Sequence, residues 1–150
     1  MKILVCTDGS GQSQKAIDAA SKIAGGCNVA EVAVIHVYEP SKNGPYRVEG
    51  NETLTEDLTR QLREFNEQEK EKSKKILSEA AILFANKNIK VNTILKEGSA
   101  AETIVSVASE EGFDIVVLGS RGLSGLKKMF LGSVSNAVLH EIKSNVLIVK

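Results

Sequence analysis

The chain has 150 residues, 42% of them hydrophobic, and its 19 Lys and Arg residues balance its 19 Asp and Glu residues. This length suits one globular domain, residues 1–150, and a net charge of zero argues against nonspecific binding to nucleic acid or to an acidic membrane surface. The two cysteines, Cys6 and Cys27, lack a CxxC spacing, so we interpret both as reduced, structural residues of a cytoplasmic protein.

Short apolar runs predict the β-strands. The first, residues 3–7, is too short for a signal peptide or a membrane span, so we expect no membrane association. Further runs cover residues 29–38, 91–95, 113–118 and 146–149. They are rich in Val and Ile and do not alternate with polar residues, which is typical of strands buried on both faces of a parallel sheet.

Helical patterns separate these runs. Apolar residues recur every three or four positions in residues 16–24, before a pair of glycines, and again in residues 101–108. The second pattern follows Ser99, which forms a capping-box sequence with Glu102. Each of these two helices therefore has a predicted start or stop.

The longest segment between two runs covers residues 39–88. A loop is predicted first, from Pro40, Gly44, Pro45 and Gly50, and a second capping box begins at Thr53. A helix over residues 53–86 would be roughly 50 Å long, and residues 66–75 contain no apolar side chain. We therefore expect either a break, or a helix that projects past the sheet with its apolar end, residues 76–84, docked.

Alternating strands and helices predict an α/β fold in three layers, with a doubly wound, five-stranded parallel sheet. In such sheets ligands bind beyond the carboxyl ends of the strands, where the strand order reverses. Unusual residues follow four of the predicted strands: Thr7 and Asp8 after the first, His36 to Glu39 at the second, Gly98 after the third, and a glycine-rich stretch after the fourth.

The glycine-rich stretch, residues 119–133, reads GSRGLSGLKKMFLGS. Glycines allow positive φ and close approach of the backbone, and a helix N-terminus attracts anions, so the stretch can cradle a phosphate. It can equally be a flexible connector that ends in a helix cap at Ser133. A Walker loop is excluded, because its spacing does not place Gly-Lys after Gly119 or after Gly122.

Two other nucleotide or phosphate sites fit the sequence less well. The turn after the first strand has Gly9 and Gly11, as in a dinucleotide-binding fingerprint, but Gln14 replaces the third glycine and Asp8 would repel a pyrophosphate. This fingerprint stays as the weaker alternative. A phospho-acceptor receiver domain needs an acidic pair after the first strand and an Asp after the third, where Glu97 stands, so it fits less well still.

The spacing Gly119-x-x-Gly122, nine residues, then Gly132-Ser133 resembles the nucleotide-binding signature of the universal stress protein family. Similar segments run through the whole chain, at residues 2–8, 34–37, 98, 114–120 and 145–149. The resemblance implies a Rossmann-like fold of the adenine nucleotide alpha hydrolase-like type. It also implies a homodimer formed through the last strand, from Val146 to Val149, an apolar strand that would be exposed unless it is paired.

The same resemblance implies a site for ATP, or for ADP or AMP, with Mg²⁺, between the first and fourth strands. Val37 would meet the adenine edge through its backbone, and Cys6, Thr7 and Leu118 would wall the base. Asp8 would face the ribose or hold the metal, unless it merely caps the first helix. The ribose and phosphates would lie among Gly119, Ser120, Arg121, Gly122, Gly132, Ser133, Val134 and Ser135, with Lys127 and Lys128 adding positive charge.

The implied function is that of an ATP-binding, nucleotide-dependent switch or stress-response factor that acts through its homodimer. Neither His36 nor His140 is interpreted as a catalytic base, and Ser133 has no evident His partner, so we expect binding rather than catalysis. Two alternatives stay open. One is a slow metal-dependent ATPase or nucleotidyl transferase that uses Asp8, and the other is a dimerising module that binds no nucleotide.

Overall fold

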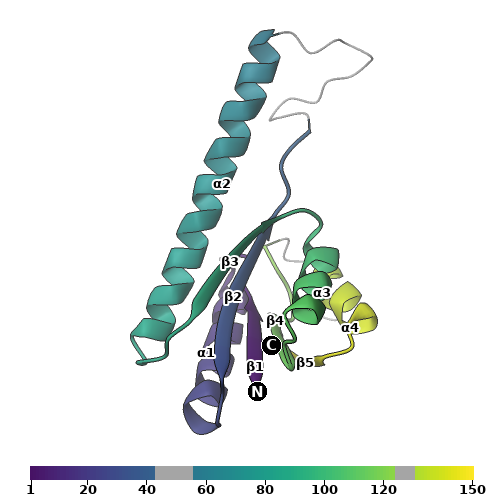
Figure 1. The fold of residues 1–150 in the computed structure, drawn as a ribbon. Helices are drawn as coiled ribbons and strands as arrows, with labels where there is room; N and C mark the ends of the chain where they lie inside the picture. Colours follow the sequence, from purple (N-terminus) through teal and green to yellow (C-terminus); the bar gives the residue numbers. More distant parts are fainter. Residues whose placement is uncertain (43–55, 124–130) are drawn as a thin grey trace.

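The structure is a computed structural model that describes residues 1–42, 56–123 and 131–150. Its sheet has five strands, all paired in parallel, in the order β3-β2-β1-β4-β5 (Figure 1). The strand order reverses between β1 and β4, which confirms the predicted doubly wound topology. The strands are β1 (Lys2–Cys6), β2 (Glu31–Tyr38), β3 (Asn92–Glu97), β4 (Ile115–Gly119) and β5 (Asn145–Val149).

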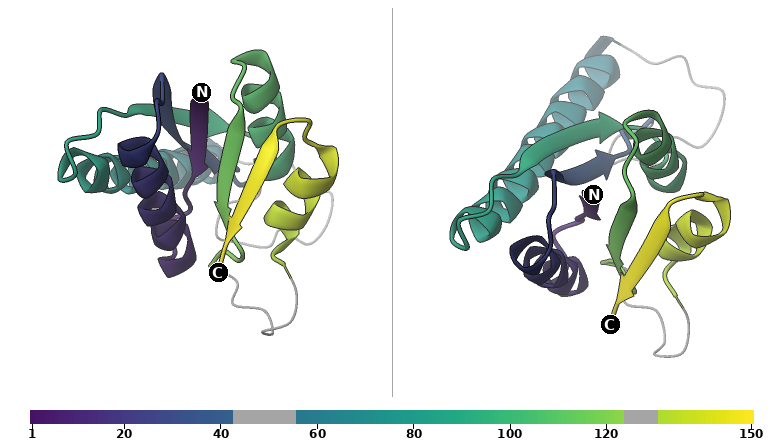
Figure 2. Two further views of the ribbon diagram at one scale, coloured as in Figure 1. Left: turned by 90° about the horizontal axis from the view of Figure 1, so that it is seen from below. Right: turned by 60° about the horizontal axis from the view of Figure 1, so that its bottom comes forward.

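Helices cover both faces of the sheet and so complete the three layers. Helices α1 and α2 lie on one side and α3 and α4 on the other (Figure 2). In the described residues no helix is both long enough and apolar enough to cross a membrane. The helices are α1 (Gly11–Gly26), α2 (Glu56–Ala85), α3 (Ala100–Glu110) and α4 (Ser133–Glu141).

The core has two halves, one on each face of the sheet. Successive strand residues point to opposite faces, so Ile3 of β1 packs with Phe84 of α2, whereas Leu4 packs with Ile104 of α3 and Val138 of α4. All of these side chains are at most 4% exposed. Both faces of β1 are therefore buried, which explains its uninterrupted apolar sequence.

The edge strand β3 departs from the prediction of burial on both faces. Its residues Asn92, Thr93, Lys96 and Glu97 are exposed, and the two apolar residues between them are only partly buried. The strand pairs with β2 on one side, and its polar residues suit an open edge. β5, at the opposite edge, is also only partly buried.

Helix α2 is unbroken over 30 residues, or roughly 45 Å, and Figure 1 shows it extending well past the sheet. Its buried residues begin at Ser73, and the preceding half carries ion pairs one turn apart, such as Lys72 with Glu69 at 2.6 Å. The expected break is therefore wrong and the projecting helix is confirmed. The predictions for Gly44, Pro45, Gly50 and the Thr53 capping box fall outside the described residues.

Candidate functional site

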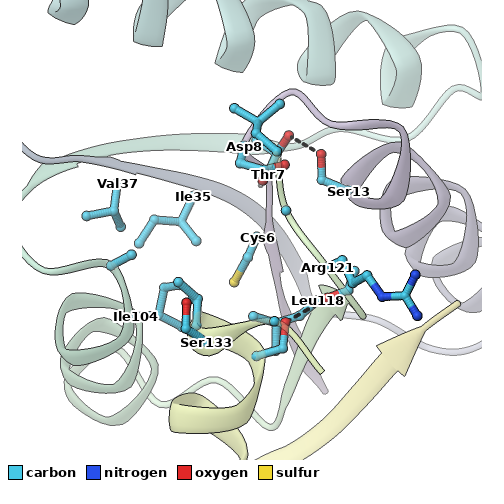
Figure 3. Close-up of a pocket in the computed structure, with 17 residues that line it drawn as sticks. Cys6, Thr7, Asp8, Ser13, Ile35, Val37, Ile104, Leu118, Arg121 and Ser133 are labelled. Atoms are coloured by element: carbon cyan, nitrogen blue, oxygen red, sulfur yellow. Dashed lines mark hydrogen bonds between the residues drawn. The ribbon is translucent and has the colours of Figure 1, made fainter. Parts of the chain in front are cut away.

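A pocket of about 240 Å³ opens at the carboxyl ends of β1 and β4, where the strand order reverses (Figure 3). This is the position at which doubly wound sheets bind ligands. Among the residues that the structure describes, all those assigned to the site from the sequence line this pocket, except Ser120. Those residues are Cys6, Thr7, Asp8, Val37, Leu118, Gly119, Arg121, Gly122, Gly132, Ser133, Val134 and Ser135.

One part of the pocket is apolar. Cys6, Ile35 and Leu118 come from adjacent central strands, and Ile104 faces them from α3 (Figure 3). Burial raises the pKa of the Cys6 thiol far above its usual range, so the thiol stays protonated and acts as a small apolar group. These side chains form a wall suited to a flat, uncharged ring system.

The turn after β1 forms a polar rim held by its own hydrogen bonds. Ser10 caps α1, because its Oγ accepts a hydrogen bond of 3.1 Å from Ser13 N. Asp8 Oδ1 accepts one of 2.9 Å from Ser10 N. The alternative in which Asp8 caps α1 is therefore wrong, and the carboxylate orders the turn and lines the pocket instead.

The signature glycines permit close approach of neighbouring atoms. None of Gly119, Gly122 and Gly132 has a left-handed φ, so the prediction that these glycines supply positive φ is wrong. A β-carbon on Gly119 would lie 2.8 Å from the carbonyl carbon of Gln12 in α1, and one on Gly132 would lie 3.3 Å from Cα of Arg121. Gly122 faces the carboxylate of Asp8.

Two helices begin at the pocket without a side-chain cap. Gly132 is the N-cap of α4, so the predicted cap at Ser133 is wrong and Ser133 is the first helical residue. Ser99 is the N-cap of α3, but its hydroxyl makes no cap hydrogen bond, so the predicted capping box does not form. N–H groups in a first helical turn have no acceptor within the helix, and these two turns line the pocket with Ala100 and residues 133–135. Both ends therefore favour a negatively charged ligand.

Ser120 and Ser135 hold the base of the glycine-rich stretch. Ser120 N donates to Val149 O at 2.7 Å, and Ser120 O accepts from Gly132 N at 2.8 Å. The hydroxyl of Ser135 donates to Gly119 O at 2.8 Å. Ser120 is buried by these contacts and does not line the pocket, so its assignment to the site has no support from the geometry.

The remaining charged candidates contribute less to the described pocket. The guanidinium of Arg121 points away from the apolar side chains (Figure 3). Lys127 and Lys128 lie outside the described residues, as does Gly125. His140 is exposed on α4, whereas His36 is buried and its Nδ1 is bonded to the backbone.

Several lining residues were not predicted. Ile35 lies two residues before Val37 on the same face of β2, so the two-residue period of a strand identifies it. Ile104 follows Ala100 by one helical turn in α3, and no motif marks either residue. The others are Ser13 and Leu123.

Comparison with known proteins finds similarity over the full length of the chain. The sequence profile of the universal stress protein family matches residues 1–150. Universal stress protein YxiE of Bacillus subtilis is 39% identical over 149 residues, which make up 99% of this chain and 98% of that protein.

Solved structures share the fold. The structure of MJ0577 from Methanocaldococcus jannaschii has a TM-score of 0.79 and 28% identity. The match covers 99% of this chain and 94% of MJ0577. The structure of a universal stress protein in complex with cAMP has a TM-score of 0.70 and 25% identity. The match covers 99% of this chain and 95% of that one.

Proposed function

The chain belongs to the universal stress protein family, and on this premise we propose that its pocket binds an adenine nucleotide, with ATP as the main ligand. The observation that carries the proposal is the composition of the pocket at the strand switch point. An apolar wall lies on one side and the uncapped N-termini of two helices on the other. A similar protein was solved with cAMP, which supports an adenine ligand.

The adenine base occupies the apolar part in this proposal. Ile104 and Leu118 contact its faces, and Cys6 lies beneath it. The backbone of Val37, at the end of β2, supplies hydrogen bonds to the edge of the ring. The pocket is slightly smaller than the roughly 300–1,000 Å³ typical of ligand sites, so it suits a nucleoside with its phosphates at the rim.

The ribose and phosphates occupy the polar part. Asp8 has one carboxylate oxygen engaged by Ser10 N, and we assign the other, Oδ2, to a ribose hydroxyl. The first-turn N–H groups at Ser133, Val134 and Ser135 bind phosphate oxygens. Mg²⁺ accompanies the triphosphate. Asp8 is the one carboxylate among the described lining residues and is assigned to the ribose, so the metal would depend on phosphate oxygens for its ligands.

We propose that occupancy of this site acts on other molecules through a homodimer. Asn145 N donates to Asp114 O, and Ser120 N donates to Val149 O. The backbone N–H and C=O groups of residues 145 and 149 in β5 therefore point toward β4. Since neighbouring residues in a strand point these groups in opposite directions, Val146 and Ile148 direct theirs outward. A second copy of β5 can pair with this edge.

Calorimetric titration of the purified protein with ATP, ADP, AMP and cAMP, with GTP as the control, tests the binding proposal. We expect adenine nucleotides to bind and GTP to bind more weakly. Mass spectrometry of small molecules released by heating identifies any nucleotide that copurifies. No binding of any adenine nucleotide, with or without Mg²⁺, would show that the proposed function is wrong.

Slow metal-dependent hydrolysis or nucleotidyl transfer is the second candidate, because the carboxylate of Asp8 lies at the pocket. We propose binding without rapid turnover, since His36 donates to a backbone carbonyl and does not line the pocket. Turnover that disappears in Asp8→Ala while ATP binding persists would favour the enzyme instead.

A further inference from the structure

His36 makes an unusual contact at the end of the first two strands. It is 8% exposed, and its Nδ1 lies 2.7 Å from the carbonyl oxygen of Thr7. Because a carbonyl can only accept, Nδ1 carries the proton and donates it. The contact joins β2 to the residue that follows β1 and precedes Asp8, at the wall of the pocket.

This contact replaces the next step of the β1–β2 ladder. The register ends at Cys6 opposite Ile35, and the last backbone bond runs from Thr7 N to Ile35 O at 3.0 Å. In a parallel ladder the following bond would run from Val37 N to Thr7 O. Among the described residues, Val37 N makes no such bond to Thr7 O. Thr7 O accepts a hydrogen bond from the His36 side chain instead.

The consequence falls on Val37, which lines the pocket. Its N–H and C=O point to the same side of β2 as those of Ile35, toward β1, whereas Tyr38 O accepts from Gly98 N on the β3 side. With the ladder ended at Ile35, both backbone groups of Val37 are left to the pocket. They present one donor and one acceptor side by side.

We infer that His36 is a positioning residue for base selectivity, because it takes Thr7 O and thereby keeps the Val37 N–H available to the ligand. The inference rests on the proposed function. Adenine offers an acceptor at N1 beside the donor N6–H, which complements the N–H and C=O of Val37. Guanine offers the donor N1–H beside the acceptor O6, which opposes that pair.

His36→Leu removes the donor and keeps an apolar side chain. Thr7 O is then free to accept from Val37 N, so the ladder extends and the pocket loses a donor. We expect ATP affinity to fall about tenfold, as for one lost hydrogen bond, while GTP affinity changes little. His36→Asn places an amide N–H at the same branch point, and we expect it to bind ATP like the wild type.

Amide exchange at Val37, followed by NMR, measures the proposed step directly and without nucleotide. We expect rapid exchange in the wild type and in His36→Asn, and protection in His36→Leu. The matched control is His140→Leu, which removes the exposed histidine of α4 and should leave both exchange and the ATP to GTP ratio unchanged. A purely structural role for His36 would lower stability without moving the exchange rate of Val37.

The inference is overturned if His36→Leu keeps the wild-type ATP to GTP ratio and the wild-type exchange at Val37. It is also overturned if His36→Asn folds but loses selectivity for ATP, which covers the case in which the Leu variant does not fold. A wild-type protein that binds no adenine nucleotide refutes the proposed function alone, because the exchange of Val37 without nucleotide still decides the role of His36.

Discussion

A β-carbon on residue 122 would lie 2.5 Å from Oδ2 of Asp8, so the glycine at this position lets the carboxylate stay where it is. The two residues follow different strands, β4 and β1, and meet at the strand switch point. Gly122 does not have a left-handed φ, so an alanine there has no backbone penalty. The glycine is therefore explained by the space that Asp8 needs.

Gly122→Ala should weaken ATP binding by about 10- to 100-fold, as expected if a charged hydrogen bond to the ligand is lost when Asp8 is displaced. Stability should change little, because the backbone tolerates alanine. Calorimetry and thermal unfolding measure the two effects. Gly25→Ala is the control, since a β-carbon there meets no atom within 4 Å. Unchanged affinity in Gly122→Ala would contradict the role given to this contact.

Gly119→Ala should act on the fold. The new β-carbon would meet the backbone of Gln12 in α1 at 2.8 Å, and neither element can move without disturbing the core. We expect a loss of about 1–3 kcal/mol in the free energy of unfolding, measured by urea denaturation. Wild-type stability in this variant would show that α1 moves away from β4 at little cost.

Asp8→Asn should weaken ATP binding about tenfold, because the ribose loses a charged acceptor while the turn keeps a neutral one. If Asp8 binds the ribose, calorimetry gives the same loss with Mg²⁺ as with EDTA. A loss confined to the titrations with Mg²⁺ would assign Asp8 to the metal instead.

If the proposed dimer forms through β5, Ile148→Pro should convert it to a monomer without unfolding the chain, because it removes an N–H that points away from β4. Ile148→Ala removes the side chain but keeps that N–H, so it should stay dimeric. Light scattering after size-exclusion chromatography gives the mass of each. A dimeric Pro variant would rule out pairing through β5.

Alkylation should distinguish the two cysteines. Cys27 is exposed, whereas Cys6 is buried and its raised pKa keeps the thiol protonated well above neutral pH. We expect iodoacetamide at pH 8 to modify Cys27 alone in the folded protein, and both residues after denaturation, as read by mass spectrometry. Modification of Cys6 in the folded protein would indicate opening of the pocket.

The interpretation of Cys27 as a structural residue is wrong, because its side chain is exposed.

The sequence was most informative where one physical requirement dominates. Burial on both faces made β1 and β4 uninterrupted apolar runs, and the spacing of Gly119, Gly122 and Gly132 located the pocket. In contrast, the apolar run at residues 91–95 predicted a strand buried on both faces, whereas β3 lies at an edge and is exposed at both of its ends.

Cap positions depend on backbone direction, which residue types do not determine. Ser133 and Asp8 both have side chains that suit a cap, but the caps are Gly132 and Ser10. The course of α2 was also ambiguous, because a polar run can end a helix or extend it into solvent with ion pairs such as Lys74 with Glu71. Ser120 belongs to a segment, residues 114–120, that resembles the family, but its backbone bonds are used within the fold.

The hydrogen bond from Gly132 N to Ser120 O closes the glycine-rich stretch at its base. Ser120 N also donates to Val149 O, so the two ends of the stretch are tied to each other and to the last strand, β5. The N-terminus of α4 at the pocket is therefore fastened to the edge strand β5 through two successive backbone hydrogen bonds.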